Sequence, residues 1–187
     1  MSRPLKVVAL SGGTWRPSRT LVLTQALLAE LAGHLNIESH LIELGDIARP
    51  LGGALSRQEL SAEVEAELLA IEQADLLIVA APVYRGSYPG LLKHLFDLID
   101  INALIDTPVL LAATGGSERH ALVLEHQLRP LLSFFQAMTL PIGVYATEAD
   151  FADYQITSEL LKARIRLAAE RAAPLFATQI KPLLKIA

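Results

Sequence analysis

Residues 11–20, SGGTWRPSRT, combine side-chain types that bind anions. The stretch offers serine and threonine hydroxyls together with Arg16 and Arg19, and it directly follows the apolar run 5–10. The helix predicted behind it would add unpaired backbone N–H groups and the positive end of its dipole. A monophosphate would fit this combination. The alternative is that Ser18 caps the helix and that both arginines lie in solvent.

Two later loops carry residues suited to a flat ligand. Residues 82–90, PVYRGSYPG, contain a proline and a glycine that indicate an outward-turned backbone, and Tyr84 and Tyr88 could flank a planar ring. Residues 113–120, ATGGSERH, contain two glycines that permit a close approach of the backbone to a ligand. Each loop alone could be an ordinary turn before a helix. Together with residues 11–20, they favour a ligand site.

The sequence lacks the patterns of enzymes whose own side chains carry the chemistry. It has no cysteine, which excludes disulfides, thiolate catalysis and cysteine-ligated metals. Its five histidines show no H-x-x-x-H or H-E-x-x-H spacing, so we expect no metal site. Neither GGSER nor RGSYPG matches the G-x-S-x-G pattern of serine hydrolases. We therefore expect a cofactor to carry the chemistry, with no catalytic side chain.

Short apolar runs alternate with helical periodicity along the chain. The apolar runs predict five strands, at residues 5–10, 38–44, 74–84, 107–116 and 140–146. Apolar residues at helical spacing predict five helices, at residues 19–33, 57–73, 89–100, 119–138 and 157–177. Segment 45–56 is rich in Gly, Pro and Ala and is predicted to be a loop.

This alternation predicts an α/β fold with a parallel sheet and helices on both faces. Five strands in 187 residues favour the flavodoxin-like strand order 2-1-3-4-5, in one domain spanning residues 1–187. In such sheets, ligands bind outside the carboxyl ends of the strands. Because all three polar loops leave those ends, we expect them to meet at one site.

Composition and charge limit the kinds of partner and the cellular compartment that the sequence favours. The net charge of −4 gives no attraction to nucleic acid or to an anionic membrane. No stretch approaches the roughly 18 apolar residues of a membrane span, and the first apolar run is too short for a signal peptide. We expect a soluble, cytoplasmic protein.

Three motifs together, SGGTWRPSRT, PVYRGSYPGLLKHLFDL and LLAATGGSERHALVLEHQLRPLLSFF, resemble the NAD(P)H-dependent FMN reductases of two-component sulfonate monooxygenase systems, especially those of methanesulfonate systems. The likeness covers nearly the whole chain. It implies hydride transfer from NADH or NADPH to FMN, and release of FMNH2 to a partner flavin-dependent sulfonate monooxygenase. In that reaction, FMN is a substrate that leaves reduced.

The resemblance also implies which residues bind FMN. Its phosphate would be held by the first loop, at Ser11, Arg16, Ser18, Arg19 and Thr20. The pyrimidine edge of the flavin would lie along Pro82, Val83, Tyr84, Arg85, Gly86 and Ser87. The other side of the ring would be closed by Thr114, Gly115, Gly116 and Ser117.

The resemblance further implies self-association, since members are usually dimers or dimers of dimers, and the sulfonate-linked relatives carry an extra residue in the fourth helix as a π-bulge at the tetramer interface. This chain has His126 where the alkanesulfonate branch has a tyrosine, so helix 119–138 either keeps the bulge or runs regular. Two other functions stay open. One is a quinone or azo-dye reductase that retains FMN, and the other is a flavodoxin-like electron carrier.

Overall fold

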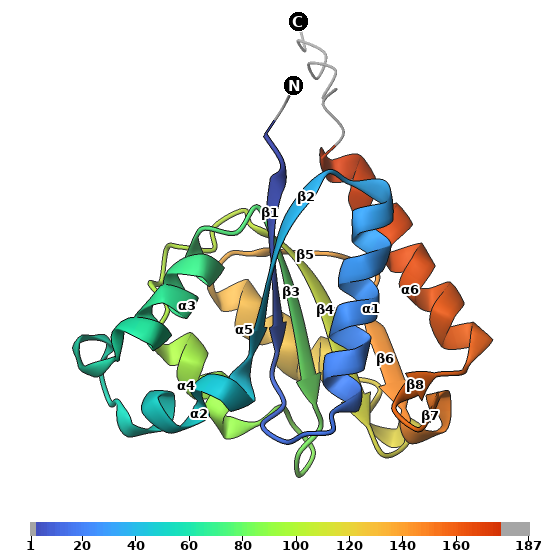
Figure 1. Ribbon diagram of the computed structural model, residues 1–187, viewed down its shortest axis with the longest axis horizontal. Helices are drawn as coiled ribbons and strands as arrows, with labels where there is room; N and C mark the ends of the chain where they lie inside the picture. Colours follow the sequence, from blue (N-terminus) through green and yellow to red (C-terminus); the bar gives the residue numbers. More distant parts are fainter. Residues whose placement is uncertain (1–2, 177–187) are drawn as a thin grey trace, which may run out of the picture.

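The computed structural model describes residues 3–176 of the chain (Figure 1). Its centre is a parallel sheet with the strand order β2-β1-β3-β4-β5, which confirms the predicted flavodoxin-like order. A sixth strand, β6, also pairs with β4. The strands are β1 (Leu5–Ser11), β2 (Ile37–Glu43), β3 (Leu76–Pro82), β4 (Pro108–Gly115), β5 (Met138–Thr139) and β6 (Val144–Thr147).

The predicted fifth strand is split into two short pieces. Leu140 still donates its N–H to the Val109 carbonyl, but the next residue is Pro141, which has no N–H to give to β4. Pairing with β4 resumes at Val144. The break therefore has a visible cause in the sequence, the LPIG stretch at 140–143.

Helices cover both faces of the sheet, as predicted (Figure 1). On one face lie α1 (Arg19–His34) and α6 (Glu159–Ala172). On the other lie α2 (Leu44–Gly53), α3 (Ala62–Glu72), α4 (Gly90–Asp97) and α5 (Arg129–Phe134). Alternate residues of β1 enter opposite cores, with Val7 packing toward α1 and Val8 toward the other face. This two-sided burial explains why the central strands read as unbroken apolar runs.

The predicted loop at 45–56 is wrong for most of its length, because α2 occupies Leu44–Gly53. Leu44, Ile47 and Leu51 recur at helical spacing and are buried in the core beside α4. Tertiary packing of this apolar stripe outweighs the poor helix propensity of the glycines and Pro50. The predicted helix at 57–73 begins later, at Ala62, after a short 3₁₀ turn at Arg57–Glu59.

The predicted helix at 119–138 is not regular. It contains a π-helix at Leu124–Leu128, in which the Arg129 N–H donates to the Leu124 carbonyl five residues earlier. Pro130 follows and cannot donate to the His126 carbonyl, which disfavours a regular α-helical ladder here. Of the two alternatives left open by the sequence, the structure has the π-turn around His126.

The C-terminal helix α6 is followed by a 3₁₀ turn at Ala173–Phe176, and residue 177 of the predicted helix lies outside the described residues. A hairpin that the sequence did not predict, β7 (Phe151–Ala152) and β8 (Gln155–Ile156), lies between β6 and α6. Across residues 3–176, no helix is both long and apolar enough to cross a membrane.

Candidate functional site

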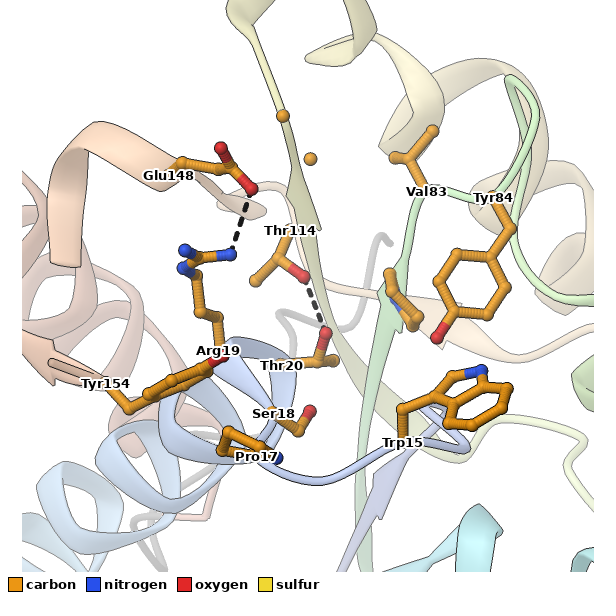
Figure 2. Close-up of a pocket in the computed structure, with 13 residues that line it drawn as sticks. Trp15, Pro17, Ser18, Arg19, Thr20, Val83, Tyr84, Thr114, Glu148 and Tyr154 are labelled. Atoms are coloured by element: carbon orange, nitrogen blue, oxygen red, sulfur yellow. Dashed lines mark hydrogen bonds and ion pairs between the residues drawn. The ribbon is translucent and has the colours of Figure 1, made fainter.

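A pocket of about 200 Å³ lies where the carboxyl ends of β1, β3, β4 and β6 meet (Figure 2). All three loops singled out from the sequence contribute to it, together with the segment that follows β6. Its lining residues are Trp15, Pro17, Ser18, Arg19, Thr20, Pro82, Val83, Tyr84, Thr114, Gly115, Gly116, Glu148 and Tyr154. The parallel sheet brings these distant segments together, because parallel strands end at the same edge.

The first loop presents the N-terminus of α1 to this pocket. Ser18 is the N-cap, and its Oγ accepts a hydrogen bond from the Leu21 N–H at 3.1 Å. The capping interpretation of Ser18 is therefore confirmed, while the residue also lines the pocket. Arg19 and Thr20 are the first residues of the helix, so their N–H groups have no acceptor within it. The positive end of the helix thus opens onto the cavity.

A buried pair of hydroxyls joins the first loop to the third. Thr20 and Thr114 are 2% and 7% exposed, and their Oγ1 atoms lie 2.5 Å apart. Thr20 also accepts at its carbonyl from the Thr24 hydroxyl. A hydrogen bond between two hydroxyls uses only one of the two protons, so one O–H of the pair has a proton to donate elsewhere. Both residues line the pocket, which makes a bound anion a suitable acceptor.

Arg19 is the cation of the pocket and already has two partners (Figure 2). Its Nη1 donates to Glu148 Oε1 at 2.9 Å, and its guanidinium carbon lies 5.4 Å from the centre of the Tyr154 ring. The Arg19 and Glu148 side chains are 38% and 61% exposed. This is consequently a solvent-screened ion pair that another anion can replace.

The second loop forms a tight turn at the rim of the pocket. Tyr84 and Ser87 pair as an isolated antiparallel bridge, and the two residues between them, Arg85 and Gly86, have φ of 54° and 89°. Two consecutive positive φ values are typical of a type I′ turn. The Arg85 and Gly86 amides donate to no other described group, whereas the Tyr84 amide donates to the Ser87 carbonyl. Two amides at this tip therefore have no acceptor among the described residues.

The third loop needs its first glycine for a packing reason. A Cβ on Gly115 would overlap the hydroxyl of Tyr145, which donates to the Ser117 carbonyl at 2.6 Å. A Cβ on Gly116 would meet nothing within 4 Å. Gly115 thus makes room for Tyr145, in addition to lining the pocket. Burial raises the pKa of the Tyr145 hydroxyl, which keeps it protonated and able to donate.

The predicted site residues divide into two groups. Those that line the pocket are Ser18, Arg19, Thr20, Pro82, Val83, Tyr84, Thr114, Gly115 and Gly116. Those outside its lining are Ser11, Arg16, Arg85, Gly86, Ser87 and Ser117. The last four directly continue the second and third loops, so they lie next to lining residues in the chain.

Arg16 and Ser11 instead line a neighbouring cavity, which shares Trp15 and Ser18 with the first pocket. The Arg16 guanidinium pairs with Glu43 at 2.7 Å and with Asp46 at 3.2 Å. Its hydrogen bond with Glu43 and the charge of that carboxylate raise the Arg16 pKa. The Arg16 side chain thus pairs with two carboxylates outside the pocket. The sequence resemblance would instead place it at the phosphate.

Four lining residues were not predicted: Trp15, Pro17, Glu148 and Tyr154. Trp15 lies in the loop at residues 11–20 and is 75% exposed, and its ring borders the pocket. Glu148 and Tyr154 follow β6, whose carboxyl end lies at the same edge of the sheet. The topological argument used for the other three loops would also have found this fourth one.

Comparisons with known proteins identify relatives over the full chain. The sequence model of a family described as NADPH-dependent FMN reductase matches residues 5–152. The chain is 92% identical, over the full length of both chains, to a Pseudomonas fluorescens (strain Pf0-1) protein named NADH-dependent FMN reductase SfnF. It is 72% identical, over 94% of its length and 95% of the relative's, to a Pseudomonas putida protein named NADH-dependent FMN reductase SfnE.

Solved structures share the architecture. An oxidoreductase from Corynebacterium diphtheriae is 33% identical and aligns with a TM-score of 0.81, over 95% of this chain and all of the other. The apo form of an NADH:FMN oxidoreductase, EmoB, is 28% identical and aligns with a TM-score of 0.82, over 94% of this chain and 92% of the other.

Proposed function

The chain belongs to the NADPH-dependent FMN reductase family, and from this premise we propose that it passes reduced FMN to a separate flavin-dependent sulfonate monooxygenase. The reductase activity itself, with NADH or NADPH and FMN, follows from the family. The three motifs that resemble reductases of sulfonate systems support the partner. Dependence on NADH or NADPH supports a cytoplasmic setting. When bound, FMN accepts the hydride, so no side chain needs redox chemistry of its own.

The observation that carries the proposal is the convergence of the loops on one pocket with a cationic end and an aromatic end. At the cationic end, Arg19 and the first amides of α1 would hold the FMN phosphate. The Thr20–Thr114 pair would donate its remaining proton to the same group. This donor set fits a phosphate in charge and in hydrogen-bonding capacity. Arg16 is left out of it, because its side chain does not line this pocket and pairs instead with Glu43 and Asp46.

At the aromatic end, Trp15 and Tyr84 border the pocket on the side away from Arg19 (Figure 2). Their rings and the Val83 side chain offer apolar surface to a flavin ring. The amides of Arg85 and Gly86, which have no acceptor within residues 3–176, would donate to the pyrimidine edge of that ring. The Arg85 side chain is exposed beside them and would favour negative charge on the reduced flavin.

The exposure of the phosphate end supports a flavin that dissociates. The pocket of about 200 Å³ includes the Arg19–Glu148 pair, whose side chains are 38% and 61% exposed. A mononucleotide held here would stay partly exposed, and the solvent-screened Arg19 would hold its phosphate only moderately. Modest affinity is what a reductase needs if the reduced flavin must leave for a second enzyme.

The test is the oxidation of NADH, followed at 340 nm in air, by purified protein with and without added FMN. The proposal predicts activity that depends on added FMN and saturates with it. Repeating the assay with NADPH compares the two coenzymes. Activity without added flavin that a quinone increases would contradict the proposal, because it would indicate a retained cofactor and a quinone reductase. Absence of oxidation with either coenzyme would contradict it in favour of an electron carrier.

The partner has its own test. A flavin-dependent sulfonate monooxygenase, supplied with its sulfonate, oxygen, NADH and FMN, should release sulfite only when this reductase is present. If NADH is oxidised at the expected rate but no sulfite forms, the assignment of this class of partner is wrong. A reductase that reduces flavin for another use would give that result.

We also propose that copies of the chain associate through the face that carries the π-helix. A second cavity of about 620 Å³ lies there, lined in part by His126, Ile101 and Phe134. Ile101 and Phe134 are 56% and 64% exposed and line the same cavity, and exposed apolar side chains grouped in this way mark interaction surfaces. Light scattering should show a dimer or tetramer that Phe134→Asp dissociates. A monomeric wild-type protein would contradict this assignment.

A further inference from the structure

Arg19 combines two properties that oppose each other. It lies at the start of α1, where the helix end and the hydroxyls favour an anion. Yet its guanidinium already donates to the Glu148 carboxylate at 2.9 Å and lies over the Tyr154 ring. A phosphate that binds Arg19 must therefore share or replace Glu148, and two anions at one guanidinium repel each other.

The residues that hold Arg19 are themselves fixed by local structure. Glu148 opens a 3₁₀ turn, Glu148–Asp150, whose capping box joins Asp150 Oδ2 to the Thr147 N–H at 2.7 Å and to its hydroxyl at 3.0 Å. Tyr154 lies in the two-residue turn of the β7–β8 hairpin, where Asp153 and Tyr154 have φ of 45° and 57°. Left-handed backbone costs energy in residues other than glycine. The hairpin thus holds the Tyr154 ring against Arg19 at some conformational cost, while the capped 3₁₀ turn places the Glu148 carboxylate.

We infer that Glu148 acts as an internal competitor for Arg19, lowering the affinity for FMN and speeding its release. This inference rests on the proposed flavin site and names a residue that tunes it. Without flavin, the Arg19 guanidinium donates to Glu148 in an exposed ion pair. When FMN binds, its phosphate replaces Glu148 as the partner of Arg19. The free energy of binding is therefore less favourable than it would be if Arg19 had no partner to lose. A reductase that must release its product benefits from this lower affinity.

The test measures FMN binding by quenching of flavin fluorescence in wild type and Glu148→Gln. Exposed ion pairs contribute little, so we expect Glu148→Gln to lower the FMN Kd by about two- to fivefold. Stopped-flow measurement should show slower release of FMN. Riboflavin, which lacks the phosphate, should bind both proteins equally. Glu118→Gln is the matched control, because Glu118 is exposed on the third loop but does not line the pocket.

A double-mutant cycle separates competition from simple charge repulsion. In an Arg19→Gln background, competition predicts that Glu148→Gln no longer tightens FMN binding. An equal tightening in that background, or with Glu118→Gln, would show general repulsion and overturn the inference. No tightening by Glu148→Gln in the wild-type background would also overturn it. If Arg19→Gln itself leaves FMN affinity unchanged, the failure lies in the proposed flavin site rather than in the role of Glu148.

Discussion

Gly115→Ala is expected to destabilise the protein through a residue that is distant in the sequence, Tyr145. A Cβ at this position would overlap the Tyr145 hydroxyl and lie 3.1 Å from its Cζ. The φ of Gly115 is not positive, so the backbone itself accepts alanine. The Tyr145 hydroxyl must move, and its hydrogen bond to the Ser117 carbonyl is lost or lengthened.

The magnitude follows from these two effects. Losing one hydrogen bond costs about 0.5–1.5 kcal/mol, and inserting a methyl group into a packed site costs about 1–3 kcal/mol. Their sum is about 1.5–4.5 kcal/mol of the free energy of unfolding. For a chain of this size, each kcal/mol lowers the Tm by about 2–4 °C. We therefore expect a fall in Tm of roughly 3–18 °C.

Urea denaturation and thermal melting of four variants, Gly115→Ala, Gly116→Ala, Tyr145→Phe and the Gly115→Ala/Tyr145→Phe double variant, measure the effect. Gly116→Ala is the matched control, because a Cβ there meets nothing within 4 Å and alanine should be neutral or slightly stabilising. In Gly115→Ala/Tyr145→Phe the overlapping hydroxyl is gone and only the 3.1 Å approach to the ring Cζ remains, so Gly115→Ala should cost much less in the Tyr145→Phe background than in the wild type. Equal stabilities for Gly115→Ala and Gly116→Ala would refute the reasoning, as would a double variant in which both losses simply add.

Three further predictions concern the pocket and its support. Arg19→Ala should weaken FMN binding by about 0.5–2.8 kcal/mol. The loss of a charged hydrogen bond costs about 1.5–3 kcal/mol. About 0.2–1 kcal/mol of this is offset, because the pair with Glu148 no longer has to be broken. Fluorescence titration checks this, and an equal loss of riboflavin affinity would point away from the phosphate. Trp15→Ala should weaken FMN and riboflavin alike by about 0.5–1.5 kcal/mol and, because Trp15 is 75% exposed, change the free energy of unfolding by less than about 0.5 kcal/mol. Burial raises the pKa of Asp150, but the hydrogen bonds that its carboxylate accepts, chiefly from the Thr147 N–H, lower the pKa by more. The pKa of Asp150 therefore lies below its ordinary value. Asp150 should therefore stabilise the protein above pH about 4, and this contribution should vanish as the pH falls through the lowered pKa. Asp150→Asn should then cost about 1 kcal/mol at pH 7 and nothing in strong acid, as urea denaturation at several pH values would show.

The central sheet could be predicted because its strands are buried on both faces. Leu76–Pro82 and Pro108–Gly115 read as apolar runs, and their alternation with helices indicates parallel order. Helix α2 could not be predicted from composition, because its glycines and Pro50 indicate a loop, and its stripe of three apolar residues at helical spacing is a weaker signal until its burial is seen. The β7–β8 hairpin has strands of two residues each, too short for any periodic signal.

The site was predictable where it depends on topology and not where it depends on individual pairings. Loops at the ends of parallel strands must meet, so Ser18, Tyr84 and Thr114 were expected to lie together. No local pattern shows that Arg16 pairs with Glu43 or that Arg19 pairs with Glu148, since these partners lie 27 and 129 residues away. The sequence therefore does not show that Arg19 lines the pocket and that Arg16 does not.

A crystal structure of the protein with FMN tests the central claim most directly, that one pocket formed by these loops holds the flavin. We predict the phosphate within hydrogen-bond distance of the Arg19 guanidinium and the first amides of α1, with the ring beside Trp15 and Tyr84. A phosphate bound to Arg16, or a flavin in the cavity beside His126, would contradict the account.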